Sequence, residues 1–283
     1  MRKIFPAGPA APDIRADDVE ALAELYAYPA VSSGAPWLRA NMIESIDGAS
    51  SLNGRSGGLS GAADRLVFAV LRSLADVILV GAATARAEKY RPVREQEIWP
   101  KLRGERQQPT PPIAVVTRKL DLDLDSPLVA GAPGGARTIL LTTKAAPAGR
   151  RAAASAHADV VVTGRDTVPP SAAVQELASR GYRNVLLEGG PALLRQVAEA
   201  GLLDDLCLTF SPLLEGGKAG RILAPPPAHP SGPAPAAPFM GGGPGSGGSS
   251  GTAARESAAM KLSLAHVLED DGSLLCRYLR ADG

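Results

Sequence analysis

The sequence is poor in the residue types that build metal sites and disulfide frameworks. It contains two cysteines and three histidines among its 283 residues. Cys207 and Cys276 lie in separate apolar, strand-like surroundings, which favours buried reduced thiols over a zinc motif or a disulfide. The histidines, at positions 157, 229 and 266, lack the spacing of metal ligands. The sequence therefore predicts no metal site.

Net charge and long apolar runs are also missing. Thirty Lys and Arg against 29 Asp and Glu give a formal charge of +1, so no long-range field favours nucleic acid or an anionic membrane. No segment approaches the ~20 apolar residues of a membrane span, and no apolar stretch of the signal-peptide type follows the first residues. We therefore expect a soluble cytoplasmic protein whose partner is a small molecule.

The sequence does have an alternation of short apolar runs and helical segments. With 45% hydrophobic residues, the chain is long enough to bury a sizeable core. Strands are predicted at 37–46, 77–80, 113–116, 138–141, 160–162, 185–187 and 206–210. Helices are predicted at 62–74, 172–180 and 191–200. This alternation is typical of an α/β domain with a mainly parallel sheet that is covered on both faces.

The two ends of the chain differ from this pattern. Residues 1–36 are predicted to be an N-terminal appendage with one short helix at 16–26, and residues 37–283 to be a single domain. Segments 261–267 and 274–280 predict an antiparallel β-hairpin around an Asp271-Gly272 turn. Residues 225–251 hold eight Pro and eight Gly, a composition that buries too little apolar area to offset its ordering entropy. We expect a disordered insertion there.

The strongest motif is an apolar strand that runs through Glu188 and two glycines directly into a helix. Pro191 has no backbone N–H, but at the first helical position that group would have no partner within the helix. Gly189 and Gly190 let a ligand approach the backbone closely. Free N–H groups at such a helix start can bind a phosphate or pyrophosphate. The plainer alternative is a tight strand-to-helix turn without a ligand, and spacing alone does not decide between the two.

A second strand-to-loop junction begins at Gly81. Small residues there leave room for a ligand, Thr84 offers a hydroxyl, and Arg86 is placed to meet an anion, although a solvated arginine in an ordinary turn is the alternative. A third strand ends at Thr117 and Arg118, whose cation would suit a 2′-phosphate. Ligands of α/β sheets bind outside the carboxyl ends of strands, so these junctions favour a nucleotide cleft.

A polar pattern marks the first strand of the domain. Alternation along residues 41–48 sends Asn41, Ile43, Ser45 and Asp47 to one side. Polar groups on one side of a core strand need hydrogen-bond partners, and a bound polar substrate is one candidate. The alternative is an edge strand that ends in an Asp-Gly turn.

Taken together, these motifs resemble a known family. Ser45-Ile46-Asp47-Gly48, Ser60 ahead of a helix, Val80-Gly81-Ala82-Ala83-Thr84 and Glu188-Gly189-Gly190-Pro191 occur in the order and at the separations of the C-terminal reductase domain of bifunctional riboflavin-biosynthesis deaminase/reductase proteins. The resemblance runs from about residue 37 to 210 and resumes at 261–280. No His-x-Glu with a Pro-Cys-x-x-Cys zinc signature is present, so the deaminase half is missing and a stand-alone reductase is implied.

The resemblance implies a dihydrofolate reductase-like fold and NADPH as the cofactor. It implies hydride transfer to a C=N carbon that converts 5-amino-6-ribosylaminouracil phosphate into its ribitylamino form. A homodimer is also expected, because relatives join through their C-terminal strands and the hairpin would offer an unpaired edge. With the motifs above, the candidate cofactor-binding residues are Gly81, Ala82, Thr84, Arg86, Thr117, Arg118, Gly189, Gly190, Pro191, Ala192 and Leu193. The candidate substrate-binding residues are Asn41, Ser45, Asp47, Ser60 and Glu188.

One residue departs from the family pattern. Asp64 stands where bifunctional members often carry a basic residue near the substrate phosphate, whereas dihydrofolate reductases bind the pterin ring with an acidic residue at a similar place. A dihydrofolate or pterin reductase is therefore an alternative. Asp47, Asp64 and Glu188 are the candidate proton donors, and the sequence does not rank them. A non-catalytic NADP-binding module is the alternative from another class, because a fold does not establish a function.

Overall fold

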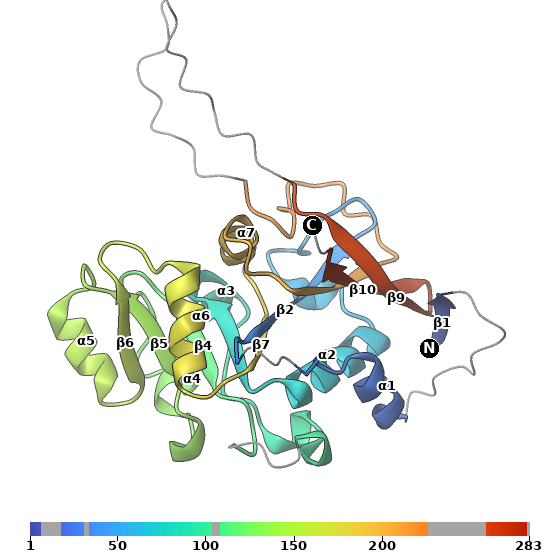
Figure 1. The fold of residues 1–283 in the computed structure, drawn as a ribbon. Coiled ribbons are helices and arrows are strands. Elements are labelled where there is room, and N and C mark those ends of the chain that lie inside the picture. Colours follow the sequence, from blue (N-terminus) through green and yellow to red (C-terminus); the bar gives the residue numbers. More distant parts are fainter. Residues whose placement is uncertain (7–17, 31–33, 104–107, 226–258, 282–283) are drawn as a thin grey trace, which may run out of the picture.

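The computed structural model describes residues 1–6, 18–30, 34–103, 108–225 and 259–281. Its centre is a ten-stranded sheet in the order β1-β9-β10-β8-β2-β7-β3-β4-β5-β6. Figure 1 shows β1, β9 and β10 at one end of the molecule and β6 with helix α5 at the other. The insertion predicted at 225–251 lies outside the described residues, apart from Pro225.

The bounds of the elements follow the chain. The strands are β1 (Arg2–Phe5), β2 (Trp37–Ser45), β3 (Val77–Gly81), β4 (Ile113–Val116), β5 (Ile139–Thr143), β6 (Asp159–Gly164), β7 (Asn184–Leu187), β8 (Asp205–Ser211), β9 (Leu262–Asp270) and β10 (Ser273–Arg280). The α-helices are α1 (Val19–Leu25), α2 (Ala62–Leu74), α3 (Ala82–Ala87), α4 (Pro127–Ala130), α5 (Ala148–Ser155), α6 (Pro170–Ser179) and α7 (Pro191–Glu199). Short 3-10 helices are η1 (Ser56–Gly58), η2 (Glu95–Glu97), η3 (Pro100–Leu102) and η4 (Gly134–Ala136).

Most of the sheet is parallel. Strands β8, β2, β7, β3, β4, β5 and β6 pair in parallel, whereas β10, β9 and β1 pair antiparallel. This confirms the predicted fold class, including the C-terminal hairpin. Strand β7 comes late in the chain but lies between β2 and β3. The carboxyl ends of β2, β7, β3 and β4 are therefore neighbours where the strand order reverses, the place at which α/β sheets bind ligands.

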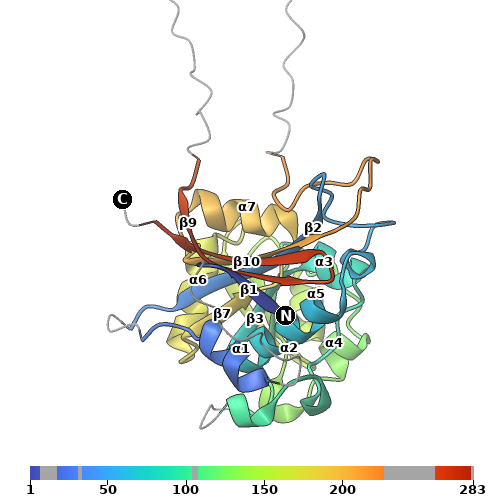
Figure 2. The same ribbon diagram turned by 90° about the vertical axis from the view of Figure 1, so that its right-hand side faces the viewer.

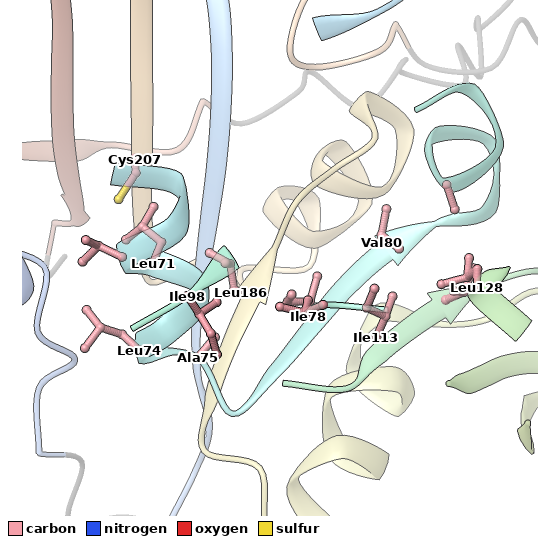
Figure 3. Close-up of a cluster of buried hydrophobic side chains, with 14 of the residues drawn as sticks. Leu71, Leu74, Ala75, Ile78, Val80, Ile98, Ile113, Leu128, Leu186 and Cys207 are labelled. Atoms are coloured by element: carbon pink, nitrogen blue, oxygen red, sulfur yellow. The ribbon is translucent and has the colours of Figure 1, made fainter. Parts of the chain in front are cut away.

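Two apolar layers cover the sheet, and strand β3 shows how they divide. Val77 and Leu79 belong to the cluster that includes residues of α6 and α7, whereas Ile78 and Val80 belong to the cluster that includes residues of α1 and α2. Figure 2 shows α7 on one side of the strands and α1 and α2 on the other. Figure 3 shows Leu71 of α2 among the side chains of the second cluster. Burial on both faces explains why these strands are continuous apolar runs.

The N-terminal segment contributes to this architecture. Strand β1 pairs with β9, with Arg2 opposite Glu269, so it covers the hairpin edge that the sequence suggested would be unpaired. The helix predicted at 16–26 is found as α1, whose first turn is capped by the Asp18 carboxylate, which accepts a hydrogen bond from the backbone N–H of Ala21. Tyr26 at its end is buried. Residues 1–36 were predicted as an appendage, and their described parts extend the sheet and the core.

The predicted hairpin turn is confirmed. Asp271 and Gly272 have φ angles of +48° and +75°, the left-handed values that a tight two-residue turn requires. No helix in the described ranges is long and apolar enough to cross a membrane. Within the same ranges, no three His, Cys, Asp or Glu side chains are grouped so that they could hold a metal ion.

Candidate active site

Two cavities adjoin at the carboxyl ends of the central strands. The smaller, of about 450 Å³, lies between the starts of α3 and α7 and the residues that follow β4. The larger, of about 670 Å³, lies between β2, α2 and the segment after α3. Thr84, Gly190 and Pro191 line both cavities. Two ligands that each filled one cavity would therefore meet at these three residues.

The two strand-to-helix junctions are held side by side by backbone hydrogen bonds. Gly81 N–H donates to the Gly189 carbonyl at 2.9 Å, and Glu188 N–H donates to the Leu79 carbonyl at 3.0 Å. Gly189 has a φ of +96°, which favours glycine. A Cβ atom at Gly190 would lie 2.1 Å from Thr84 Oγ1. The close approach of the two junctions and the positive φ of Gly189 therefore favour glycine at both positions.

The smaller cavity offers backbone donors and positive charge. Gly190 caps α7, Pro191 has no N–H, and the N–H of Ala192 lies in the first turn, where no intrahelical acceptor exists. Arg118 and Lys119 line the cavity as exposed residues. Arg86 also lines it and forms an ion pair with Asp121, with 3.4 Å between Nη1 and Oδ2. Three cations against one carboxylate make this lining suitable for an anion.

The structure brings all of the predicted cofactor-binding residues together. The smaller cavity is lined by Gly81, Ala82, Thr84, Arg86, Thr117, Arg118, Gly190, Pro191, Ala192 and Leu193, and the larger one by Gly189. Lys119, Thr167 and Gln196 also line the smaller cavity and were not predicted. Lys119 directly follows the predicted pair Thr117-Arg118. Its position just after β4 is the sequence feature from which it could have been predicted.

The larger cavity contains a buried ionic cluster, which we name the cavity clamp and define as Arg72, Tyr90 and Glu188. Arg72 Nε and Nη2 donate to Glu188 Oε1 and Oε2, both at 2.7 Å. The Tyr90 hydroxyl donates to Oε2 at 2.7 Å. The Glu188 side chain is 2% exposed and that of Arg72 14%. The Glu188 carboxylate therefore meets three donors inside the protein.

Electrostatics in the cavity clamp favour the charged arginine and the neutral tyrosine. Burial alone would lower the pKa of Arg72, but the adjoining Glu188 carboxylate outweighs it and raises that pKa. Burial, and then the Glu188 charge, raise the pKa of Tyr90 well above its usual value. The Tyr90 hydroxyl therefore keeps its proton and remains a donor to Glu188.

Three other predicted residues line the larger cavity. Asn41 lies on β2, and Ser60 and Asp64 lie just before and within the first turn of α2. The Ser60 hydroxyl donates to Asp64 Oδ2 at 2.5 Å. Asp64 is buried. No Lys or Arg pairs with the Asp64 carboxylate among the described residues. Its hydrogen-bond partner is the Ser60 hydroxyl, and both residues line the cavity.

Ser45 and Asp47 lie apart from these residues. The buried Ser45 hydroxyl donates to Asp47 Oδ1 and accepts the Ala49 N–H. The exposed Asp47 carboxylate also accepts the N–H groups of Glu215 and Gly216. The Ser45 hydrogen bond, and then the two N–H groups, lower the pKa of Asp47 to about 2. Neither Ser45 nor Asp47 is among the residues that line the two cavities, because β2 ends at Ser45 and the chain then turns away.

Several residues of the larger cavity were not predicted from the sequence. Arg72 ends the polar side of α2, and Tyr90 lies in a segment without a motif, so neither gave a signal. Arg65, Lys89 and Arg91 also line the cavity as exposed cations. Arg65 donates to the Ser60 carbonyl and Arg91 pairs with Glu97, whereas Lys89 forms no ion pair within the described part of the chain.

Comparison with known proteins relates this chain to one family. A family model described as the RibD C-terminal domain matches residues 36–233. A 2,5-diamino-6-ribosylamino-4(3H)-pyrimidinone 5′-phosphate reductase of Archaeoglobus fulgidus is 27% identical over 185 residues, which cover 65% of this chain and 83% of that protein. A protein of the same description from Methanothermobacter thermautotrophicus is 27% identical over 191 residues, covering 66% and 83%.

Solved structures share the fold. A pyrimidine reductase-like protein of Corynebacterium diphtheriae superposes with a TM-score of 0.72 and 24% identity, covering 93% of this chain and 99% of that one. Acinetobacter baumannii RibD superposes with a TM-score of 0.61 and 16% identity, covering 89% of this chain and 60% of that one. Because the RibD chain is longer, this chain matches only a part of it.

Proposed function

The chain belongs to the RibD C-terminal domain family, and from this premise we propose that it is an NADPH-dependent reductase of a 6-ribosylaminopyrimidine 5′-phosphate in riboflavin biosynthesis. The observation that carries the proposal is the pair of adjoining cavities. One offers bare amides and excess positive charge, and the other is walled by a fixed ionic cluster. A dinucleotide and a polar ring can therefore meet at Thr84 and Gly190.

The lining of the smaller cavity fits an NADP-type cofactor. A Cβ atom at Gly190 would fill the space between this residue and Thr84, since that atom would lie 2.1 Å from Thr84 Oγ1. The start of α7 would hold the pyrophosphate with backbone N–H groups. Arg86, Arg118 and Lys119 would bind further phosphate charge, and Arg118 has no ion-pair partner in the described ranges. A 2′-phosphate is the group that such exposed cations would recognise, which supports NADPH over NADH.

Gly190→Val tests the cofactor half of this proposal. The valine side chain would displace Thr84 and obstruct the bare amides at the start of α7. Loss of two charge-assisted hydrogen bonds would weaken NADPH binding by about 2 kcal/mol or more. Calorimetry on the variant and on Gly149→Val, at an exposed position in α5 where a Cβ meets nothing within 4 Å, provides the matched comparison. Unchanged NADPH affinity in Gly190→Val would refute the phosphate role of this turn.

The larger cavity suits a ring that carries a sugar phosphate. Its polar wall includes Asn41, Ser60, Asp64 and the cavity clamp, and its exposed cations include Lys89. Because Lys89 has no ion-pair partner in the described part of the chain, it is available to a phosphate group. The 2,5-diamino-4(3H)-pyrimidinone named for the archaeal relatives is the first ring to test, and the deaminated uracil that the sequence suggested is the second.

The reduction needs a hydride at the sugar C1′ of the open-chain imine and a proton at the adjoining nitrogen. When bound, NADPH supplies the hydride to that carbon. The protein contributes by holding donor and acceptor together and by limiting water between them. Of the three candidate carboxyls, Asp47 lines neither cavity and Glu188 meets three donors, which leaves Asp64. We propose that Asp64, with the Ser60 hydroxyl that donates to it, relays a proton to the substrate nitrogen.

The deciding experiment is an assay of NADPH oxidation at the nicotinamide absorbance. We expect turnover with a ribosylaminopyrimidine 5′-phosphate, a higher KM for the substrate without its phosphate, and slower turnover in Asp64→Asn. Equal affinity for NADPH and NADH would contradict the cofactor assignment. Tight NADPH binding without turnover of any pyrimidine or pterin would instead identify a non-catalytic binding module.

The pterin alternative rests on one observation. Asp64 is buried in the wall of the larger cavity on the first turn of α2, and a carboxylate can grip an amidine edge by paired hydrogen bonds. Dihydrofolate in the same assay separates the cases. Faster turnover of dihydrofolate than of the pyrimidines would favour a pterin reductase.

We also propose a homodimer. Because β1 covers the hairpin, the outer edge of β1 is the edge at that end of the sheet where a second chain could pair. Ile4 and Phe5 on β1 are each 40% exposed. Light scattering at micromolar concentration that reports a monomer would contradict this assembly.

A further inference from the structure

Arg72 is fixed at the cavity wall but does not use all of its hydrogen-bond donors. Its Nε and Nη2 atoms donate to Glu188. Nη1 donates to no described residue, and it is not one of the completely buried atoms that lack a hydrogen-bond partner. Arg72 lines the larger cavity, and the two N–H groups of Nη1 have no acceptor among the described residues.

Three contacts hold this guanidinium in one orientation. The fork to Glu188 fixes its plane, and the Tyr90 hydroxyl fixes the Glu188 oxygen that accepts from Nη2. The Phe68 ring packs against one face, with its centroid 4.2 Å from the Arg72 Cζ atom. A donor held in this way loses little side-chain entropy when it binds a ligand.

We propose that Arg72 Nη1 binds the ring carbonyl oxygen of the substrate, and that Glu188 and Tyr90 act as positioning residues for Arg72. The inference rests on the proposed function and specifies how the same cavity recognises its ring. Glu188 then acts on the substrate through Arg72, which fits its 2% exposed side chain.

The charge of the cavity clamp favours a carbonyl oxygen over a phosphate. Arg72 and Glu188 are paired, so together they carry no net charge, and a buried phosphate would find no compensating cation there. A neutral carbonyl needs only a donor, and a charged donor makes the stronger hydrogen bond. Lys89 also lines this cavity and forms no ion pair within the described residues, so it is the better partner for the phosphate.

The test compares two ligands that differ in one acceptor atom. The 4(3H)-pyrimidinone named for the archaeal relatives has a single ring carbonyl, and its 4-thioxo analogue replaces that oxygen with sulfur, a weak acceptor. Calorimetry with the full-length protein saturated with NADP⁺ measures both affinities without turnover. We expect the wild-type protein to prefer the oxo compound by about 10- to 100-fold, the effect of one charge-assisted hydrogen bond.

Two variants assign this preference to Arg72. Arg72→Met with Glu188→Met removes the donor and replaces the ion pair by apolar side chains of similar length, an exchange that buried pairs often tolerate. We expect NADP⁺ affinity to persist and the oxo preference to vanish. Tyr90→Phe retains the ion pair but removes one of the two hydrogen bonds to Glu188 Oε2, and should reduce the preference severalfold with unchanged NADP⁺ affinity.

Tyr182→Phe is the matched control, because it makes the same chemical change at a residue that lines neither cavity. It should retain the full preference. If the double variant does not fold, Tyr90→Phe alone decides, since a purely structural role would leave its oxo preference at the wild-type value.

The outcomes separate this inference from the proposed function. A wild-type protein that reduces the pyrimidinone yet binds the oxo and thioxo compounds equally would overturn the inference alone. The same holds for a preference that survives in both the double variant and Tyr90→Phe. A wild-type protein that binds neither compound would overturn both the inference and the proposed function.

Discussion

Two buried arginine–carboxylate clusters occur in this molecule, each built from residues far apart in the sequence. One is the cavity clamp around Glu188. The other, which we name the hairpin cluster, consists of Arg39, Asp205 and Arg277 on β2, β8 and β10. Asp205 Oδ2 accepts from Nε and Nη2 of both arginines, at 2.6 to 3.1 Å. Both clusters are buried, but they differ in whether their remaining donors have partners.

The hairpin cluster uses its remaining donors on the chain itself. Arg39 Nη1 donates to the Tyr26 carbonyl and Arg277 Nη1 to the Leu25 carbonyl, both at 2.5 Å. The Nη2 atoms of both arginines also reach the Ala27 carbonyl. These carbonyls lie at the C-terminal end of helix α1, where acceptors lack intrahelical partners and carry partial negative charge. The cluster thereby joins α1 to the sheet and has a structural role.

Among the described residues no backbone carbonyl accepts from Arg72 Nη1, and Arg72 lines the larger cavity. A satisfied cluster stabilises the fold, whereas a cluster with an accessible donor is prepared for a ligand. We therefore expect damage to the hairpin cluster to lower stability, and damage to the cavity clamp to weaken substrate binding and turnover.

The largest effect on stability is expected for Asp205→Asn. The change leaves two buried guanidinium groups without a carboxylate, and the loss of one partner of a buried pair costs about 3–5 kcal/mol. Urea denaturation of the variant measures the free energy of unfolding. The matched change in the cavity clamp is Glu188→Gln. If Asp205→Asn unfolded at the wild-type urea concentration, the structural role of the hairpin cluster would be refuted.

The next effect is the acid sensitivity that His266 gives to the same region. Burial, and then the charges of Arg277 and Lys3, lower the pKa of His266 to about 4. Its ring lies edge-on to Tyr26, at 4.8 Å between centroids. In the unfolded chain a histidine titrates near 6.5, so between pH 6.5 and 4 only the unfolded state takes up the proton. The stability present above pH 6.5 should therefore fall by up to about 3 kcal/mol as the pH drops to 4.

His266→Phe isolates this contribution. The variant retains an aromatic ring against Tyr26 and cannot titrate. Urea denaturation at pH 7 and pH 4.5 should show a smaller loss of stability in the variant than in the wild-type protein. Equal losses would mean that His266 is protonated in the folded state or that other groups control the acid response.

Glu188→Gln should affect the cavity more than the fold. The amide keeps one acceptor for Arg72 but loses the charge, and solvent in the cavity can reach the guanidinium. We expect a loss of stability of about 1–2 kcal/mol, below that of Asp205→Asn, and a decrease in kcat/KM of about tenfold or more. NADPH affinity should be unchanged, because the smaller cavity is not altered. A variant that lost stability but retained kcat/KM would place the cavity clamp beside the hairpin cluster as a structural device.

Most of the fold follows from local sequence patterns. Helix α2 and strand β4 have the predicted bounds, because burial on both sheet faces demands uninterrupted apolar strands and an apolar stripe on the covering helix. Strand β1 was not predicted, since its four residues include Arg2 and Lys3 and form a strand only by pairing with β9. Helix α3 is short and rich in small residues, so its sequence predicts a loop.

The candidate site divides in the same way. The glycine junctions could be predicted from the sequence because each is a contiguous motif. The structure brings their residues together around two cavities. The pairing within the cavity clamp could not be predicted from the sequence, because Arg72 and Glu188 are 116 positions apart and only the sheet order brings them together. Alternation placed Asp47 with Asn41, but the turn after β2 moves it to the surface.

The smallest effect is expected for Asp47→Asn. Asp47 accepts hydrogen bonds from three groups, as Glu188 does, but it is exposed, so water can replace the carboxylate in the variant. Its pKa is about 2, so any stability that its charge contributes is present above pH 4 and is lost as the pH falls through 2. At pH 7 we expect only a slight decrease in Tm and nearly unchanged turnover. A large loss of turnover with an unchanged Tm would show that Asp47 acts on the substrate, and that three donors to a carboxylate do not by themselves distinguish a structural from a functional role.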